Sequence, residues 1–187
     1  MRGYSCAKND TTPVISRRRF LQFASACAAV GALPAWARVG ETRALAFENL
    51  HTGEALAITY FDAGQYDDVA LAAINHVLRD FRTDEVFPIR TALLDQLVLV
   101  RTAIGSDAPF QIISGYRSPR TNDMLHRQSS GVARRSLHMD GMAIDVRLAD
   151  TRTRVLRDTA AELNLGGVGY YAQSNFVHLD IGRPRQW

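Results

Sequence analysis

Two histidines and one aspartate in the second half of the chain have the residue types and spacing of a metal site. His138 and Asp145 lie in SLHMDGMAID (residues 136–145), which has the form S-x-H-x-x-G-x-A-x-D, and His178 lies in FVHLD (residues 176–180). Zinc binds imidazole nitrogen and carboxylate oxygen, and a catalytic zinc keeps three protein ligands and one open position for water. A glycine turn after His138 can fold the chain back so that Asp145 approaches it. His178, on a neighbouring strand, would complete the set.

Each of these residues also has an ordinary structural explanation. A single histidine in a strand is commonly a half-buried side chain bonded to the backbone, and Asp145 can pair with Arg147 instead. Two of the chain's five histidines nevertheless fall in these two segments, and an acid inside a strand needs a partner. The combination therefore favours a metal site over three unrelated polar side chains.

Three further segments extend the pattern along the chain. NLHTGE occupies residues 49–54, SGYRS residues 114–118 and GGVGYY residues 166–171. Residues 109–187 resemble the zinc peptidases that include the D-Ala-D-Ala carboxypeptidases, the vancomycin-resistance dipeptidase and phage L-Ala-D-Glu endolysins. The first and third segments are similar to the murein endopeptidase K branch in particular. So is the leader, in which residues 16–21 (SRRRFL) have a twin-arginine pattern. The resemblance implies a hedgehog-like fold and an endopeptidase that hydrolyses peptidoglycan (murein) cross-links between stem peptides in the bacterial cell wall.

The resemblance also implies roles for individual residues. His138, Asp145 and His178 would hold one Zn²⁺ per chain, which lowers the pKa of a bound water to about 7 and polarises the scissile carbonyl. Arg117 would reach that carbonyl or an adjacent substrate carboxylate, which makes it a catalytic and a substrate-binding candidate; a structural salt bridge is the alternative. Further substrate contacts are expected from Ser136, Tyr170 and Asn175.

The general base is where the sequence departs from the family pattern. Many relatives carry Glu or Asp three residues before the last histidine, whereas this chain has Asn175, which cannot take a proton. Asp180 shares a strand face with His178, so it is the expected catalytic base. It can equally be the acceptor that holds the imidazole of His178 in place. Asp140 is a less favoured candidate.

The elements that must position these residues belong to the α+β class, with helices first and mostly antiparallel strands behind them. Apolar alternation predicts a hairpin and three later strands, at residues 45–50 and 55–61, 110–113, 141–148 and 176–181. Helical spacing predicts helices at residues 68–82 (capped by Asp67), 90–104 (ended by Gly105), 119–129 and 150–164 (capped by Asp150). A polar loop is expected at residues 130–137 and a tight turn at 166–169.

The first 37 residues have the pattern of an export signal in front of a single domain at residues 38–187. SRRRFL at residues 16–21 matches the twin-arginine pattern S-R-R-x-F-L, and A-x-A at residues 35–37 predicts cleavage after Ala37. The apolar run between them, residues 20–33, is too short for a permanent membrane span. The signal predicts passage through the twin-arginine translocase to the periplasm. A basic amphipathic helix and a lipid anchor on Cys27 are the alternatives.

The charge and cysteine content of the domain bear on nucleic-acid binding, on disulfides and on thiolate metal sites. The leader holds five of the 22 basic residues and one of the 19 acidic ones, which leaves 17 basic and 18 acidic residues. The net charge of +3 is therefore no argument for nucleic-acid binding. Cys6 and Cys27 both lie in the leader, so the domain has neither a disulfide nor a thiolate metal ligand.

Two other functions are compatible with the sequence. A metal-containing wall-binding module without catalysis would explain the missing acid at Asn175. A D,D- or L,D-carboxypeptidase that trims stem peptides would need a cationic group to cap the substrate terminus. Arg134 and Arg135 precede the site and can serve, although two arginines in a loop are commonly a solvated patch.

Overall fold

The computed structural model describes Met1, residues 42–129 and residues 131–187, so the motifs of the expected export signal lie outside the described residues. The elements are β1 (Arg43–Asn49), β2 (Ala55–Asp62), β3 (Gln65–Tyr66), α1 (Asp68–Val77), α2 (Thr91–Ile104), β4 (Phe110–Ser114), α3 (Pro119–Gln128), η3 (Leu137–Asp140), β5 (Ala143–Leu148), α4 (Thr153–Leu163), β6 (Gly167–Tyr171), β7 (Phe176–Asp180) and β8 (Arg185–Gln186). No helix within 42–129 or 131–187 has the length and apolar character that a membrane crossing requires.

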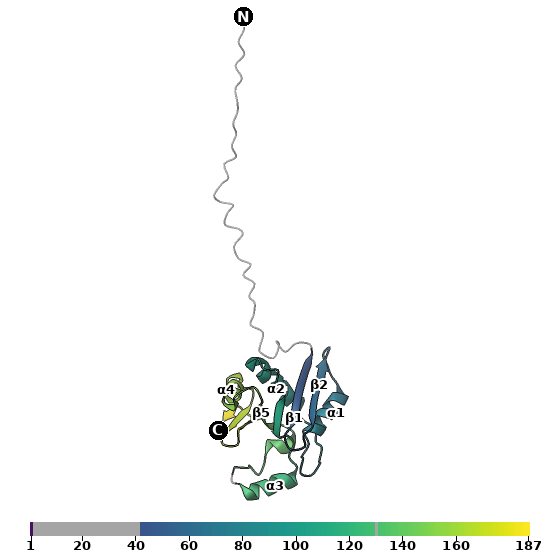
Figure 1. The fold of residues 1–187 in the computed structure, drawn as a ribbon, viewed down its shortest axis with the longest axis vertical. Helices are drawn as coiled ribbons and strands as arrows, with labels where there is room; N and C mark the ends of the chain where they lie inside the picture. Colours follow the sequence, from purple (N-terminus) through teal and green to yellow (C-terminus); the bar gives the residue numbers. More distant parts are fainter. Residues whose placement is uncertain (2–41, 130) are drawn as a thin grey trace. The chain divides into compact units, whose positions relative to one another are not determined.

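One eight-stranded sheet runs through this part of the chain, in the order β3-β2-β1-β4-β5-β7-β6-β8 (Figure 1). β1 pairs with β4 in parallel, and β6 pairs with β8 in parallel. The other neighbouring pairs are antiparallel. The mixed helix-and-sheet architecture and the mostly antiparallel pairing agree with the α+β prediction. The two-residue strands β3 and β8 were not predicted by any periodicity.

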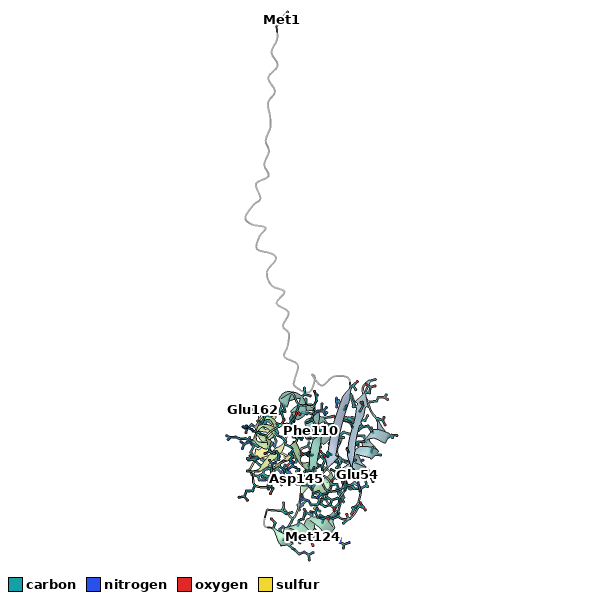
Figure 2. All side chains as sticks on the ribbon, in the orientation of Figure 1. Met1, Glu54, Phe110, Met124, Asp145 and Glu162 are labelled. Atoms are coloured by element: carbon teal, nitrogen blue, oxygen red, sulfur yellow. The ribbon has the colours of Figure 1, made fainter. Side chains whose placement is uncertain are left out.

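Side chains alternate along the strands, and one face of the sheet is apolar. Cross-strand neighbours on this face include Phe110 opposite Leu148 and Val146 opposite Val177, all buried. Buried residues of α1, α2 and α4 join the same hydrophobic cluster. Figure 2 labels Phe110 among the side chains of this domain. Fully burying a large apolar side chain contributes about 1.5–3 kcal/mol, so this cluster is the main source of stability.

The first helix begins as predicted but ends early, and the second begins one residue later than predicted, at Thr91. Asp67 caps α1 by accepting hydrogen bonds from the backbone N–H groups of Val69 and Ala70. The predicted end at residue 82 is wrong, because residues 80–85 form a turn held by the buried Asp80 carboxylate. α2 ends as predicted at Gly105, whose φ of 74° lies in the left-handed region.

Two predictions in the second half need correction. α4 begins at Thr153, and Asp150 does not cap it; the Asp150 carboxylate accepts from the hydroxyl of Ser106 at 2.8 and 2.9 Å instead. The predicted tight turn at 166–169 is also wrong, because residues 167–171 form strand β6. Its glycines make room for side chains of the β8 segment, as the contacts of Gly167 and Gly169 show.

Candidate metal centre

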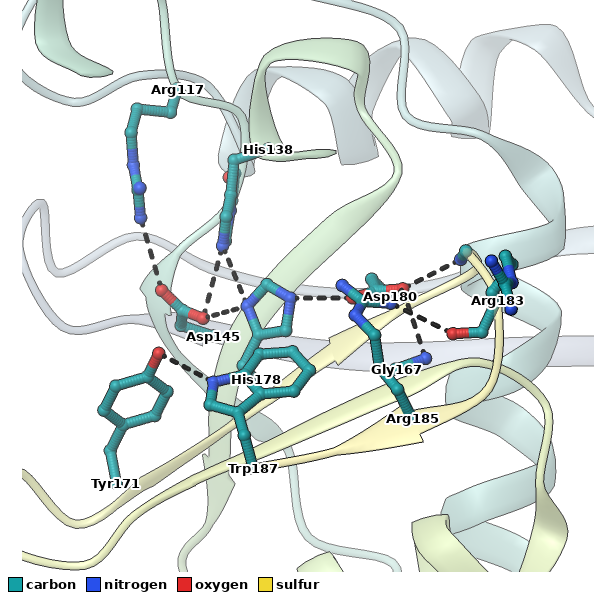
Figure 3. A network of polar contacts seen from close by, with 12 residues as sticks. Arg117, His138, Asp145, Gly167, Tyr171, His178, Asp180, Arg183, Arg185 and Trp187 are labelled. Carbon is teal, nitrogen blue, oxygen red and sulfur yellow. Dashed lines mark hydrogen bonds and ion pairs between the residues drawn. The ribbon is translucent and has the colours of Figure 1, made fainter. Parts of the chain in front are cut away.

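His138, Asp145 and His178 converge on one point at the polar face of the sheet. The Nε2 atom of His138 lies 3.2 Å from both Asp145 Oδ1 and His178 Nδ1, and the latter two atoms are 2.8 Å apart (Figure 3). Asp145 in β5 and His178 in β7 are direct cross-strand partners, which fixes their separation. All three side chains are buried.

A glycine turn brings His138 to the strands, as the sequence predicted. η3 ends at Gly141, whose φ of 63° returns the chain toward β5. A Cβ at this position would lie 2.2 Å from the carbonyl oxygen of Pro88, so only glycine fits. The Gly141 carbonyl accepts from the backbone N–H of Arg90, which anchors the turn to the segment before α2.

The hydrogen bonds around the two imidazoles leave one lone pair of each pointing inward. His138 Nδ1 lies 2.7 Å from the carbonyl oxygen of Gly115 and must donate to it, so Nε2 is the free acceptor. His178 Nε2 lies 3.1 Å from Asp180 Oδ2 and donates there, so Nδ1 is free. Two imidazole lone pairs and a carboxylate of Asp145 therefore face one another.

Such a set of acceptors needs a cation or a proton at its centre. Three ligands of a tetrahedral zinc with bonds of about 2.0–2.1 Å lie roughly 3.3 Å apart, close to the separations found here. The nitrogen and oxygen donors suit zinc chemically, and the second nitrogen of each imidazole is held by an acceptor, as in metal-binding histidines generally. His138, Asp145 and His178 therefore fit a divalent metal site.

The charges of the cluster follow from burial and from the partners. Burial opposes ionisation of Asp145, yet the two imidazoles outweigh it and hold the pKa of this carboxyl far below its usual range. Burial lowers the pKa of His138. Burial acts in the same direction on His178, but its bonds to Asp145 and Asp180 raise its pKa to about 9. The carboxylates of Asp145 and Asp180, which lie on either side of the His178 ring, thus favour positive charge there.

Asp180 is fully buried, and each of its oxygens already has protein partners. Arg185 donates Nη1 to Oδ1 at 3.0 Å and Nη2 to Oδ2 at 2.7 Å. The backbone N–H groups of Gly167 and Gly182 donate to Oδ1 at 3.1 and 2.8 Å. Despite its burial, Asp180 has a pKa well below the usual range because His178 and Arg185 donate to it. This environment is that of an acceptor that orients the His178 ring.

Arg117 lies on the opposite side of the cluster and is held loosely. Its Nη2 atom is 3.4 Å from Asp145 Oδ2 and 3.4 Å from the hydroxyl of Ser114, both long for hydrogen bonds. Its buried Nε has no partner within the described chain. Burial lowers its pKa, and the charge of Asp145 opposes that effect. The guanidinium therefore keeps N–H groups available for a substrate oxygen.

A cleft of about 320 Å³ opens over the three ligands, and it contains some but not all of the predicted substrate contacts. Arg117 and Ser136 line it, as expected. Tyr170 packs against the core, with the Arg157 guanidinium 4.9 Å from its ring centre. Asn175 accepts from the hydroxyl of Thr153, and together with Tyr170 it lines a separate hollow. The geometry does not bring Tyr170 and Asn175 to the metal cleft.

Asp140, the less favoured candidate for the base, is also absent from the cleft lining. It is exposed in η3 and ends the turn that carries His138. His138, two residues before it in η3, lines the cleft with its ring.

The cleft is also lined by Tyr171, Arg185 and Trp187, none of which was predicted from the sequence. Tyr171 follows Tyr170 in β6, and alternation places the two rings on opposite faces of the strand. Arg185 and Trp187 reach the site because β8 pairs with β6. That pairing joins segments too short to be recognised by periodicity.

The glycines of β6 were the signal that could have revealed these contacts. A Cβ at Gly167 would lie 2.4 Å from both the guanidinium of Arg185 and the carboxylate of Asp180. A Cβ at Gly169 would lie 2.6 Å from the indole of Trp187. Glycine at alternate positions of a strand marks a face against which other groups pack closely.

Comparisons with known proteins show which family the chain is similar to. A family described as "Peptidoglycan L,D-endopeptidase MepK" matches residues 37–187. The chain is 39% identical to the peptidoglycan L,D-endopeptidase MepK of Escherichia coli (strain K12) over 176 residues, which covers 92% of this chain and 97% of that protein. It is 35% identical to the probable peptidoglycan L,D-endopeptidase MepK of Haemophilus influenzae over 177 residues, with 92% and 95% covered.

Proposed function

The chain belongs to the peptidoglycan L,D-endopeptidase MepK family, and from that premise we propose that it hydrolyses L,D peptide bonds in peptidoglycan with one zinc ion held by His138, Asp145 and His178. It is an enzyme of the peptidoglycan endopeptidase type. The observation that carries the zinc assignment is the convergence of two imidazole lone pairs and a carboxylate oxygen within 3.2 Å of one another.

A zinc ion at these ligands supplies Lewis acidity toward the scissile carbonyl and lowers the pKa of a water ligand to about 7. The protein side chains provide the surroundings for that chemistry. The Gly115 carbonyl fixes the ring of His138, and Asp180 fixes the ring of His178. Such outer partners set both the tautomer and the orientation of the ligating rings.

Arg117 is the proposed electrostatic group for the substrate. Its guanidinium borders the cleft beside Asp145 and has only long bonds to the protein. A cation directed at a developing oxyanion contributes to the rate on the scale of one oxyanion-hole donor, about 10²–10³-fold. Ser136 lies at the same cleft and is proposed as a further substrate contact.

Asp180 is proposed as the orienting acceptor of His178 and not as the base. Two backbone N–H groups, one guanidinium and one imidazole already use its oxygens, and it has no solvent exposure. A group in this environment has no direct path to a water in the cleft. This supports the orienting alternative that the sequence left open.

Digestion of purified peptidoglycan tests the proposed function. The zinc-loaded protein should release fragments whose mass spectra show new termini from internal L,D bonds, and the His138→Ala protein should release none. Loss of only a terminal residue from stem peptides would indicate a carboxypeptidase. Binding to the wall without any released fragment would indicate a non-catalytic module, and either result would overturn the proposal.

We also propose that the chain is exported by the twin-arginine route and acts in the periplasm. The support is the sequence pattern at residues 16–21 and the cell-wall substrate of the family. Replacing Arg17 and Arg18 with Lys should leave the protein inside the cell. Recovery of the Lys-Lys protein in the periplasmic fraction would contradict this route.

A further inference from the structure

Trp187 lies directly against the candidate metal centre. It is outside the two segments that carry the ligands, and tryptophan is not a metal-binding residue type. Its indole is 5.3 Å from the ring centre of His178 and covers the strand at Gly169, where a Cβ would lie 2.6 Å away. Its backbone N–H donates to the Val168 carbonyl, and the Arg185 guanidinium lies 4.8 Å from its ring centre. One side of the indole thus packs against β6 and Arg185, while about half of the residue (51%) is exposed.

The indole N–H of Trp187 has a specific partner, the hydroxyl of Tyr171. Nε1 donates to the phenolic oxygen at 3.2 Å (Figure 3). An indole nitrogen can only donate, so the Tyr171 oxygen is the acceptor in this bond and its own proton remains to be donated elsewhere. Tyr171 is also stacked on Phe176, with ring centres 4.6 Å apart, so the ring has little freedom.

The Tyr171 hydroxyl borders the same cleft as Arg117 and the three metal ligands. Within residues 42–129 and 131–187, no acceptor is bonded to its proton. A hydroxyl that is held in place and has a free proton, in the cleft of the candidate metal ligands, is suited to bind an oxygen atom of the substrate. A carbonyl oxygen that gains negative charge during amide hydrolysis is the strongest acceptor available there.

We propose that Tyr171 is a catalytic residue that donates its hydroxyl proton in a hydrogen bond to the scissile carbonyl oxygen, and that Trp187 is the positioning residue that fixes this hydroxyl. The inference rests on the proposed endopeptidase function and adds a second donor to Arg117 in the same cleft. No proton is transferred in this step, because the hydrogen bond only strengthens as charge develops on the substrate oxygen.

Turnover of the zinc-loaded full chain tests the pair through a double-mutant cycle. Tyr171→Phe should lower kcat by about 10²-fold, as for one oxyanion-hole donor, with KM and zinc content unchanged. Trp187→Phe keeps an aromatic ring but lacks the N–H, so a smaller loss of about tenfold is expected, because the hydroxyl is present but less fixed. The double variant should be no slower than Tyr171→Phe alone.

The neighbouring tyrosine provides a matched control. Tyr170→Phe removes a hydroxyl one residue away, on the core side of the same strand, and should leave kcat unchanged. A wild-type kcat in Tyr171→Phe would overturn the catalytic role. The positioning role of Trp187 would be overturned if Trp187→Phe lowered kcat by the same factor in the wild-type protein and in the Tyr171→Phe protein. A wild-type protein that releases no fragments would instead contradict the proposed function.

The contact between Trp187 and the metal site can be tested without turnover. The chain has two tryptophans, Trp36 and Trp187, so in a Trp36→Phe protein the fluorescence comes from Trp187 alone. Addition of Zn²⁺ should change this emission, because the indole borders His178, and the change should vanish in the additional His178→Ala variant. An emission unaffected by stoichiometrically bound Zn²⁺ would contradict the placement of the indole.

Discussion

Strands β5, β7 and β6 have two faces that differ in nearly every respect, although the same backbone builds both. One face, here called the core face, carries Ile144, Val146, Leu148, Val168, Val177 and Leu179, all buried against apolar residues of the helices. The other, the site face, carries Asp145, Gly167, Gly169, Tyr171, His178 and Asp180. Adjacent residues of one strand therefore belong to different chemical environments.

The difference shows how the domain separates stability from function. Apolar contacts on the core face are non-directional and additive in area, so they stabilise the fold in proportion to what they bury. Contacts on the site face are polar and directional, and the inward-facing acceptors there repel one another unless a cation or proton lies between them. Changes on the core face should therefore alter the free energy of unfolding, whereas changes on the site face should alter metal binding and turnover.

The largest expected effect is the loss of a ligand from the site face. His138→Ala should lose bound zinc and at least 10³-fold of activity, because three ligands are the minimum for a catalytic zinc. Its unfolding midpoint should remain close to that of the metal-free parent, since the apolar core is untouched. Metal analysis, turnover and thermal unfolding check this together. The matched control is His76→Ala, a half-exposed histidine on α1. A variant that retains stoichiometric zinc would contradict the ligand assignment.

The neighbour of a ligand on the core face should behave in the opposite way. Leu179 follows His178 in β7 and has no exposed surface. Leu179→Ala should lower the free energy of unfolding by about 2–5 kcal/mol, through lost burial and the cavity that remains. Denaturant titration measures this loss, and the native fraction should still bind one zinc. Loss of zinc at an unchanged unfolding midpoint would show that the two faces are not separable.

A smaller effect is expected from the acceptor behind His178. Asp180→Asn should weaken zinc affinity by about 10–100-fold, with activity recovered in excess zinc, because the amide orients the imidazole less well. Competition with a chelator measures the affinity, and Asp158→Asn on the exposed surface of α4 is the control. A loss of about 10²–10⁴-fold in turnover at saturating zinc would instead assign the general-base role to Asp180.

The smallest expected effect concerns Asp80, a buried carboxylate that is not among the candidate metal ligands. Asp80 accepts from the backbone N–H and hydroxyl of Ser118 at 2.9 and 2.6 Å and from the N–H of Arg82. Burial raises its pKa, but these bonds outweigh it and the net shift is downward. Because the folded-state pKa is lowered, its stabilisation is present above the unfolded value of about 3.9 and is lost as the pH falls through the folded value.

Asp80→Asn should therefore cost about 1 kcal/mol of unfolding free energy at pH 7, the difference between charged and neutral hydrogen bonds. The difference in unfolding free energy between the variant and the parent should become smaller when urea unfolding is repeated at acid pH. Zinc affinity should not change. If this difference in unfolding free energy stays constant from pH 7 into the acid range, the charge of Asp80 contributes nothing to stability.

The core face of β5 and β7 could be predicted from the sequence, whereas β6 was not predicted and the site face was predicted only in part. Alternation of apolar residues locates β4, β5 and β7 because burial selects the same residue type at every second position. The spacing of His138, Gly141 and Asp145 predicts their fold-back because a turn is a local event. The position of His178 two residues before Asp180 in an apolar strand made it the third ligand candidate, and the resemblance to a known family supplied the role of Arg117.

The remaining features depend on contacts between segments distant in sequence. Trp187 reaches His178 through a two-residue strand, and no local pattern announces such a pairing. GGVG was interpreted as a turn because glycine is common in turns, yet here it gives clearance to the β8 side chains. Tyr170 was predicted as the substrate contact in place of Tyr171. Strand register decides which of the two rings faces the cleft, and the GGVGYY motif carries no information on register.

Gly115 couples the metal site to the core directly, and this matters for anyone who evolves the enzyme in the laboratory. Its carbonyl orients His138, while a Cβ on it would lie 2.4 Å from the carbonyl oxygen of Leu78 at the end of α1. Libraries that vary the core and the cleft independently should yield improvements that combine freely, because the two sets of contacts are distinct. Any side chain at position 115 would instead move the helix end and the metal ligand together, so selection for stability and selection for turnover would reject the same variants there.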